Sequence, residues 1–117
     1  MNILIVEDEE TVISFIQFVI KEYFNHEVYI AKSKEEAFGV EVNVDLAICD
    51  IYLGQNADGI DVAKEMFRRG ASIIMLTGSP DYLEKMGDAG ITTYITKPFT
   101  PELLMLFVEY ELLKRKL

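Results

Sequence analysis

Acidic, hydroxyl and cationic side chains stand directly after apolar segments at several places in this chain. The segment "ILIVEDEE" runs from aliphatic residues into carboxylates that include Glu7 and Asp8, and "DLAIC" leads into Asp50. Two later apolar segments lead into Thr77 and Lys97. If the three carboxylates lie close together, they repel one another, so one must take up a proton or a cation must settle among them.

Magnesium is the cation that best suits such a group of carboxylates. Mg²⁺ binds oxygen ligands and keeps several of its own waters, whereas zinc sites are built mainly from cysteine and histidine, and the chain has no cluster of these. Together with the metal, the Lys97 ammonium and the Thr77 hydroxyl would surround the oxygens of a transferring phosphoryl group. A carboxylate nucleophile such as Asp50 could then become an aspartyl phosphate.

Apolar segments typical of buried strands alternate with amphipathic segments typical of helices. The predicted strands are residues 2–6, 27–31, 45–49, 72–77 and 92–96. The predicted helices are residues 9–24, 33 to about 42, 58–70, 79–90 and 100–116. Ser33 and Glu36 form a capping-box pattern, and Thr100 followed by Pro101 suits the start of the last helix.

This alternation predicts an α/β fold, a parallel sheet with right-handed crossovers and helices on both faces. In doubly wound sheets of this kind, ligands bind beyond the carboxyl ends of the strands. If the first and third strands are neighbours, Glu7, Asp8 and Asp50 converge in one cleft. The fourth and fifth strands deliver Thr77 and Lys97 to the same edge. The second strand delivers no reactive side chain, which predicts a position at the edge of the sheet.

Length and charge exclude several classes of protein. The chain has 117 residues and a formal net charge of -9, and this length corresponds to one domain. A negative protein is unsuited to nucleic-acid phosphates and to anionic membranes, so we expect direct binding to neither. No signal peptide opens the sequence, and no apolar run approaches the about 20 residues that span a bilayer. The single cysteine, Cys49, suits a reducing compartment, which predicts a cytoplasmic protein.

Four motifs, in this order, resemble those of response-regulator receiver domains, the flavodoxin-like phosphoacceptor domains of two-component signalling. "ILIVEDEE" resembles the family's acidic pair, carried here by Glu7 and Asp8. "DLAICDIYL" resembles the phosphoacceptor segment, with Asp50 as the acceptor. "IIMLTG" and "YITKPF" resemble the segments that present a threonine and a lysine, here Thr77 and Lys97. The resemblance covers residues 1–117, so we expect one receiver domain and no output domain in this chain.

The resemblance implies a fold and a reaction. The sheet would have the strand order 2-1-3-4-5 and five helices around it. A histidine kinase or a histidine phosphotransfer protein would pass a phosphoryl group from phosphohistidine to Asp50, so the chain would be a signalling phosphoacceptor rather than an enzyme. Mg²⁺ would bind Asp8, Asp50, the main-chain carbonyl of Tyr52 and, through water, Glu7. The downstream output partner is not identified by the resemblance.

The same resemblance implies a conformational switch. Thr77 would turn toward the phosphoryl oxygens and Tyr94 would swing inward. These movements would alter the surface made by the fourth helix, the fifth strand and the fifth helix. The resemblance also implies a cis peptide bond between Lys97 and Pro98, and only bonds that precede proline adopt this form at low cost.

The sequence departs from the family pattern near the acceptor. The first acid of the pair is Glu7, where aspartate is also common. The loop "IYLGQNADG" is one residue longer than the commonest form and lacks its proline, although Asp58 and Gly59 still resemble the pair that opens the next helix. By the same resemblance, the two positions that tend to set phosphate lifetime in the family are held here by Tyr52 and Ser79, which are neither acidic nor amide-bearing. This predicts slow self-dephosphorylation.

The acidic residues and the fold class also allow other interpretations. Glu9 and Glu10 are read as first-turn helix charges rather than ligands. The alternative function is a receiver-like protein–protein interaction module that is never phosphorylated. A flavodoxin-type FMN carrier would need a hydroxyl-rich loop after the first strand, where Glu7 and its acidic neighbours would instead repel phosphate.

The last predicted helix is apolar on more than one side. Its apolar residues are Leu103, Leu106, Phe107 and Leu113 on one face, with Leu104, Val108 and Leu112 extending that surface. An exposed apolar patch of this kind would suit a protein partner. We therefore expect a homodimer through the surface made by the fourth helix, the fifth strand and the fifth helix.

Overall fold

The computed structural model describes residues 1–54, 56–78 and 80–117. Its strands are β1 (Asn2–Val6), β2 (Glu27–Ala31), β3 (Leu46–Asp50), β4 (Ser72–Thr77) and β5 (Tyr94–Thr96). They form one parallel sheet in the order β2-β1-β3-β4-β5. The predicted fold class and the edge position of the second strand are therefore confirmed.

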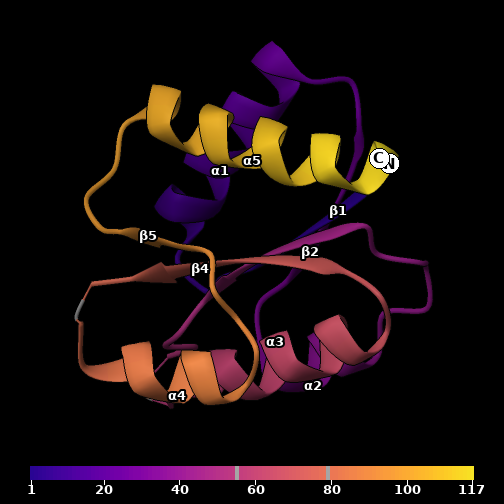
Figure 1. Ribbon diagram of the computed structural model, residues 1–117. Helices are drawn as coiled ribbons and strands as arrows, with labels where there is room; N and C mark the ends of the chain where they lie inside the picture. Colours follow the sequence, from indigo (N-terminus) through magenta and orange to yellow (C-terminus); the bar gives the residue numbers. More distant parts are fainter. Residues whose placement is uncertain (55, 79) are drawn as a thin grey trace.

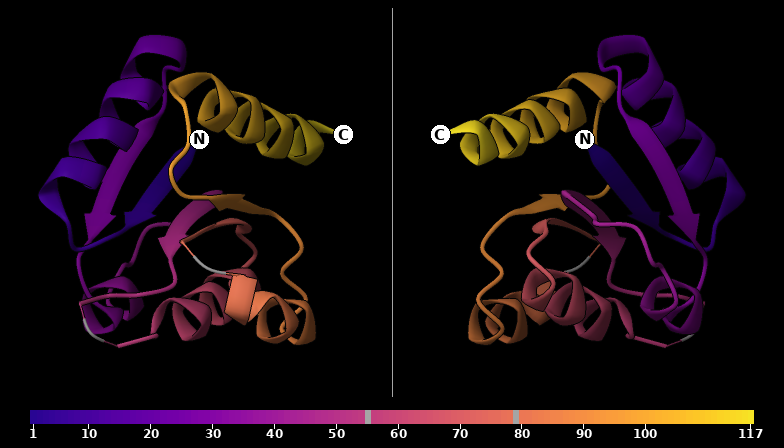
Figure 2. Two further views of the ribbon diagram at one scale, coloured as in Figure 1. Left: turned by 90° about the vertical axis from the view of Figure 1, so that its left-hand side faces the viewer. Right: turned by 90° about the vertical axis from the view of Figure 1, so that its right-hand side faces the viewer.

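The helices lie on both faces of the sheet, as Figures 1 and 2 show. They are α1 (Glu10–Tyr23), α2 (Lys34–Phe38), α3 (Gly59–Arg68), α4 (Leu83–Asp88) and α5 (Pro101–Lys116), with a 3₁₀ turn, η1 (Pro80–Tyr82), before α4. Helices α1 and α5 cover one face, and α2, α3 and α4 cover the other. None of the helices in the described ranges is long and apolar enough to cross a membrane.

Successive side chains of a strand point to opposite faces, so the sheet separates two apolar cores. On β1, Ile3 and Ile5 pack with α1 and α5, whereas Leu4 and Val6 pack with the helices of the other face. Because both faces are covered, β3 is buried along its whole length and β1 is buried after its first residue, Asn2. This burial explains why these strands read as continuous apolar runs.

Several element boundaries differ from the predicted ones. The second helix ends at Phe38 instead of about Val42, with Gly39 as its C-cap. The fourth predicted helix is divided into η1 and a shorter α4. The third strand begins and ends one residue later than predicted, so Asp50 is its last residue. Asp50 thereby belongs to the paired backbone of the sheet, which fixes its position more firmly than a loop would.

Both predicted caps are present. The Ser33 hydroxyl accepts a hydrogen bond from the Glu36 amide at 3.1 Å, and the Thr100 hydroxyl accepts one from the Leu103 amide at 3.1 Å. Pro101 occupies the first turn of α5, where its missing N–H leaves no helical hydrogen bond unmade.

The two sets of apolar residues on α5 do not form one exposed patch. Leu104, Val108 and Leu112 are buried in the core, whereas Leu103, Leu106 and Leu113 are exposed. The prediction that the former extend an exposed surface is wrong, because they are the residues that attach α5 to the sheet. The exposed apolar surface is a narrower stripe on the opposite side of the helix.

Candidate functional site

The carboxyl ends of four neighbouring strands bring the predicted site residues to one edge of the sheet. Val6 is paired with Cys49, so Glu7 and Asp50 follow at the same level of adjacent strands. Thr77 ends β4 next to Thr96 of β5, and the amide of Lys97 donates to the Thr77 carbonyl at 2.7 Å. Glu7, Asp50 and Thr77 are buried, so polar side chains here lie in a setting that strengthens their mutual electrostatics.

Lys97 is the cation of this cluster. Its ammonium forms an ion pair and hydrogen bond with Asp50 Oδ2 and lies 3.6 Å from Glu7 Oε2. Burial acts to lower the pKa of Lys97, but the hydrogen bond and the charge of Asp50 outweigh it and raise that pKa. The Lys97–Pro98 peptide bond is cis, as predicted.

Glu7 is the most deeply buried acid of the site, 1% exposed. Its Oε1 accepts hydrogen bonds from the amides of Asp8 at 3.2 Å and Glu9 at 3.1 Å. Its Oε2 is buried and makes no hydrogen bond within the described residues. Burial, together with the adjacent Asp50, raises the pKa of Glu7 to about 8. This environment therefore favours the protonated form of Glu7.

The remaining oxygens are held by the backbone of the loop between β3 and α3. The amide of Tyr52 donates to Asp50 Oδ1 at 2.9 Å, and the amide of Gly54 donates to Asp8 Oδ2 at 2.9 Å. These bonds attach the longer loop to both carboxylates. The loop therefore orients the two acids that were predicted to be direct metal ligands.

The carboxylate oxygens at this site are of the chemical type that binds magnesium, but their present positions do not surround a common point. Within the described ranges, no three acidic, cysteine or histidine side chains are close enough to form a metal site. Asp8 Oδ2 accepts a hydrogen bond from the Gly54 amide, and the Lys97 ammonium forms an ion pair with Asp50 Oδ2. The buried, unbonded Oε2 of Glu7 beside these carboxylates is nevertheless the kind of oxygen that a hard cation requires. The Tyr52 carbonyl as a ligand stays a prediction.

Gly59 packs against the backbone of Asp50 in a way that the sequence pattern does not indicate. A Cβ atom at Gly59 would lie 1.8 Å from the carbonyl oxygen of Asp50 and 2.7 Å from Cα of Ile51. The Gly59 amide also donates to the Ile51 carbonyl at 2.8 Å. The start of α3 thus packs directly on the backbone of Asp50, and only glycine permits this approach. The sequence pattern predicts a helix start at Asp58–Gly59 but does not indicate the contact with Asp50.

A second contact that the sequence did not indicate joins the loop after Asp50 to the η1 turn. The hydroxyls of Tyr52 and Tyr82 are hydrogen-bonded, and the rings meet edge to face with centroids 5.5 Å apart. Tyr94, the predicted switch residue, is 41% exposed on β5 and is not part of the buried cluster. Ser79, the second position expected to set phosphate lifetime, lies outside the described residues.

Known proteins share this architecture over most of the chain. The family model described as the response regulator receiver domain matches residues 3–109. The transcriptional regulatory protein ResD of Bacillus subtilis is 33% identical over 92% of this chain and 46% of its own length. The alkaline phosphatase synthesis transcriptional regulatory protein PhoP of Bacillus subtilis is 33% identical over 86% of this chain and 43% of its own length.

A solved structure extends the likeness to the fold. The response regulator receiver domain protein of Methanospirillum hungatei superimposes with a TM-score of 0.84 at 27% identity, covering 98% of this chain and 95% of that one.

Fold and site together define an α/β signalling domain with an aspartate at the carboxyl edge of its sheet. The chain belongs to the response regulator receiver domain family of two-component systems. It spans about half the length of the curated relatives given above.

Proposed function

We propose that this chain accepts a phosphoryl group from a phosphohistidine onto Asp50. The observation that carries the proposal is the buried carboxylate of Asp50 in an ion pair with Lys97 beside Glu7, at the carboxyl edge of β3. The donor would be a histidine kinase or a histidine phosphotransfer protein, since the response-regulator relatives imply such a partner. A cytoplasmic location accompanies the proposal, and the buried thiol of Cys49 suits it.

The reaction is an in-line displacement at phosphorus. An Asp50 carboxylate oxygen forms the new P–O bond while the P–N bond to the donor imidazole breaks, and the leaving nitrogen keeps the electron pair. Lys97 would move from the Asp50 carboxylate to the phosphoryl oxygens, where its charge remains compensated. The amide of Tyr52 holds Oδ1 of Asp50 at 2.9 Å, which orients the nucleophile.

Magnesium is expected to be needed for this transfer. Asp8, Asp50, the main-chain carbonyl of Tyr52 and, through water, Glu7 would hold Mg²⁺, which would neutralise charge on the phosphoryl oxygens. Asp8 would have to exchange its hydrogen bond from Gly54 for the metal. The Glu7 proton would leave as the cation arrives, because a cation beside a carboxylate favours its charged form.

The switch is expected to act through Thr77 and Tyr94. A phosphoryl group on Asp50 adds about -1.5 to -2 charge and acceptor oxygens, which the neighbouring Thr77 hydroxyl could bond. Tyr94 would then move from its present exposed position toward the space near β4, changing the surface made by α4, β5 and α5. Phosphorylation would shift the populations of two conformations that the chain already adopts.

Incubation with Mg²⁺ and a small phosphodonor, followed by intact-mass measurement, tests the proposal. The wild-type chain should gain one phosphoryl mass and Asp50→Asn should gain none. Asp88→Asn, at an exposed aspartate of α4, is the matched control and should be labelled like the wild type. If neither a phosphodonor nor beryllofluoride alters the wild type, the alternative of an unphosphorylated interaction module is favoured instead.

The phosphorylated chain should decay slowly, over many minutes rather than seconds. The hydroxyl of Tyr52 is engaged with Tyr82, and neither Tyr52 nor Ser79 carries an acid or amide that could orient an attacking water. Tyr52→Asn should accelerate the decay by about tenfold by supplying such a group. Tyr23→Asn, at an exposed tyrosine of α1, should leave it unchanged. The loss of phosphoryl mass with time measures both rates, and a wild-type half-life of seconds rules the idea out.

A further inference from the structure

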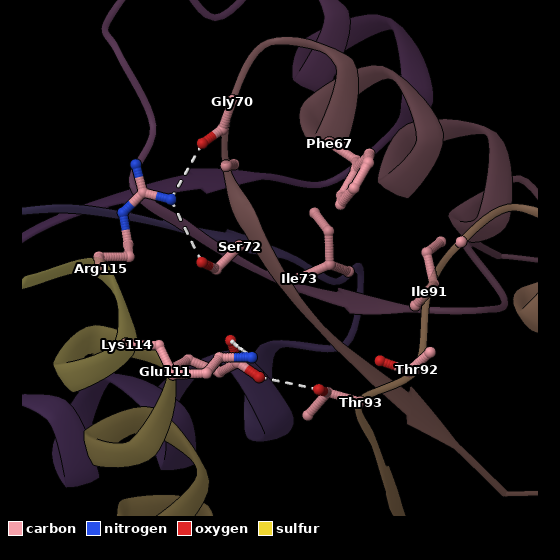
Figure 3. A pocket seen from close by; sticks show the side chains of 12 residues that line it. Phe67, Gly70, Ser72, Ile73, Ile91, Thr92, Thr93, Glu111, Lys114 and Arg115 are labelled. Carbon is pink, nitrogen blue, oxygen red and sulfur yellow. Dashed lines mark hydrogen bonds and ion pairs between the residues drawn. The ribbon is translucent and has the colours of Figure 1, made fainter. Parts of the chain in front are cut away.

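A cavity lies at the amino end of β4, away from the carboxyl edge that carries Asp50. Its volume is about 330 Å³, at the lower end of the range of about 300 to 1,000 Å³ for small-molecule sites. The end of α3, the start of β4, the residues before β5 and the last turns of α5 form its walls. Figure 3 shows Phe67 and Ile91 on one side of the cavity and Glu111 and Lys114 on the other. The cavity therefore has an apolar wall and a polar wall.

Between these walls lies a part of β4 that has no neighbouring strand on one side. The pairing of β4 with β5 begins at Met75, whose amide donates to the Thr93 carbonyl at 3.0 Å. Alternate residues of a strand direct their amide and carbonyl to the same neighbour, so those of Ile73 also point to this side. Among the described residues, neither group of Ile73 has a hydrogen-bond partner there. Because Ile73 is only 6% exposed, its main-chain groups call for a partner, and the cavity offers both of them to a ligand.

The polar wall of the cavity holds a buried carboxylate. Glu111 is 3% exposed, its Oε1 accepts from the Thr93 hydroxyl at 2.8 Å, and its Oε2 lies 3.2 Å from Lys114 Nζ. The Lys114 side chain is 48% exposed, and its ammonium also lies over the Tyr110 ring, 4.9 Å from the centroid. A buried carboxylate is costly without a cation, and each of its oxygens can accept more than one hydrogen bond. Glu111 can therefore bind the ammonium of a ligand beside Lys114 or in its place.

The charges that line the cavity select the kind of ligand. Arg115 is engaged with the protein itself, since it donates to the Gly70 carbonyl at 2.9 Å and forms an ion pair with Asp45 at 3.4 Å. Glu111 and Lys114 then leave the cavity with one negative and one positive charge. An inorganic anion would meet the buried Glu111, and a multivalent cation would meet Lys114, so each would face a like charge. A ligand with one charge of each sign matches this balance.

We propose that this cavity binds a free α-amino acid with an apolar side chain. The ammonium of the ligand would donate to the Glu111 carboxylate and the Ile73 carbonyl, and its carboxylate would accept from the Ile73 amide and from Lys114. Its side chain would lie against Phe67 and Ile91. All of these residues line the cavity. Binding uses none of the phosphoacceptor residues, so the inference stands independently of the proposed function.

Titration of the chain with L-leucine and its analogues tests the assigned contacts. A ligand of this size makes few contacts, so we expect a dissociation constant for leucine between about 10 µM and 1 mM. Leucinamide lacks the carboxylate and N-acetylleucine lacks the ammonium, so each should bind at least about tenfold more weakly. Amide chemical shifts of the ¹⁵N-labelled chain measure the affinity and also locate the ligand, because the amides of Ile73 and Thr93 should shift.

Substitutions in the two walls test them separately. Glu111→Gln keeps an acceptor for Thr93 but removes the negative charge, so it should weaken leucine binding at least about tenfold. Glu109→Gln, at an exposed acid of the same helix outside the cavity, should bind leucine like the wild type. Phe67→Ala should weaken the binding of free leucine several-fold but not that of free alanine, because it removes apolar contact with the longer side chain. Phe18→Ala, at a similarly exposed phenylalanine of α1, is its control. Circular dichroism of each variant reports whether the fold is retained.

Several results would overturn the proposal. Leucine at about 20 mM that leaves the amides of Ile73 and Thr93 unshifted would show that the cavity does not bind it. Equal affinity for leucine and N-acetylleucine, or unchanged affinity in a folded Glu111→Gln variant, would show that the buried carboxylate does not hold an ammonium. Inorganic phosphate that shifts the same amides more strongly than leucine would make the cavity an anion site instead. If Glu111→Gln does not fold, the ligand analogues with the wild-type chain and Phe67→Ala decide the question.

Discussion

Replacing Gly59 with alanine should destabilise the chain by about 3 kcal/mol and reduce phosphorylation of Asp50. The added Cβ would lie 1.8 Å from the Asp50 carbonyl oxygen and 2.7 Å from the carbonyl carbon. Because both atoms belong to the backbone, no side-chain rotation can relieve the contact. Either α3 must move away from the sheet or the end of β3 must shift, and a shift of β3 carries the Asp50 carboxylate with it.

Gly87→Ala is the matched control for this substitution. Gly87 lies inside α4, and a Cβ atom there meets nothing within 4 Å. Alanine is favoured over glycine in a helix by about 1 kcal/mol, so this variant should be slightly more stable than the wild type. Urea unfolding gives both free energies, and labelling by a small phosphodonor gives both phosphorylation levels. Equal stability of Gly59→Ala and the wild type would show that α3 does not pack on the backbone of Asp50 as described.

The sheet and its order followed from alternation of element types together with the family motifs. Short apolar runs joined by amphipathic helices leave few ways to bury both faces of a parallel sheet. The residues that come after each strand, such as Asp50 and Lys97, were predictable for the same reason, since parallel strands end at one edge. The boundaries of α2 and α4 were less predictable, because the ends of short helices depend on local tertiary contacts more than on sequence periodicity.

The state of the site depends on contacts that no sequence pattern encodes. The hydrogen bond from Gly54 to Asp8 requires the particular path of a loop that is longer than the family's commonest form. The contact of Gly59 with Asp50 depends on how closely α3 approaches β3. Apolar residues lie on more than one side of α5, so the sequence does not indicate which side faces the core. The burial of Leu104 and the exposure of Leu106 in the structure identify that side.

The stability of the metal-free chain should fall as the pH rises from about 5 to about 8, and Glu7 should be the main cause. Burial, followed by the neighbouring Asp50, raises the pKa of Glu7 from 4.5 to about 8. Between these two values the folded chain binds a proton that the unfolded chain has lost. Raising the pH therefore favours the unfolded state, with a total loss of about 3 to 5 kcal/mol once Glu7 is ionised in both states.

Glu7→Gln should remove most of this pH dependence. The glutamine side chain keeps an oxygen for the amides of Asp8 and Glu9, which donate to Glu7 Oε1 at 3.2 and 3.1 Å, and it carries no charge at any pH. At pH 8 without Mg²⁺, the variant should be more stable than the wild type, whereas near pH 5 the two should be similar. Thermal unfolding in a metal chelator across this pH range measures the difference.

Adding Mg²⁺ should reverse the order of stability at pH 8. A cation beside the ionised Glu7 compensates its buried charge. At Mg²⁺ concentrations far above the dissociation constant, the wild type should gain about 2 kcal/mol or more in its free energy of unfolding and several degrees in Tm. The variant should gain less, because glutamine offers the metal site no negative charge. Glu84→Gln, at an exposed acid of α4, should respond to Mg²⁺ like the wild type. If Glu7→Gln shows the same pH profile and the same Mg²⁺ response as the wild type, Glu7 neither holds the proton nor assists the metal. Asp8 would then be the only acid of the pair that contributes to metal binding.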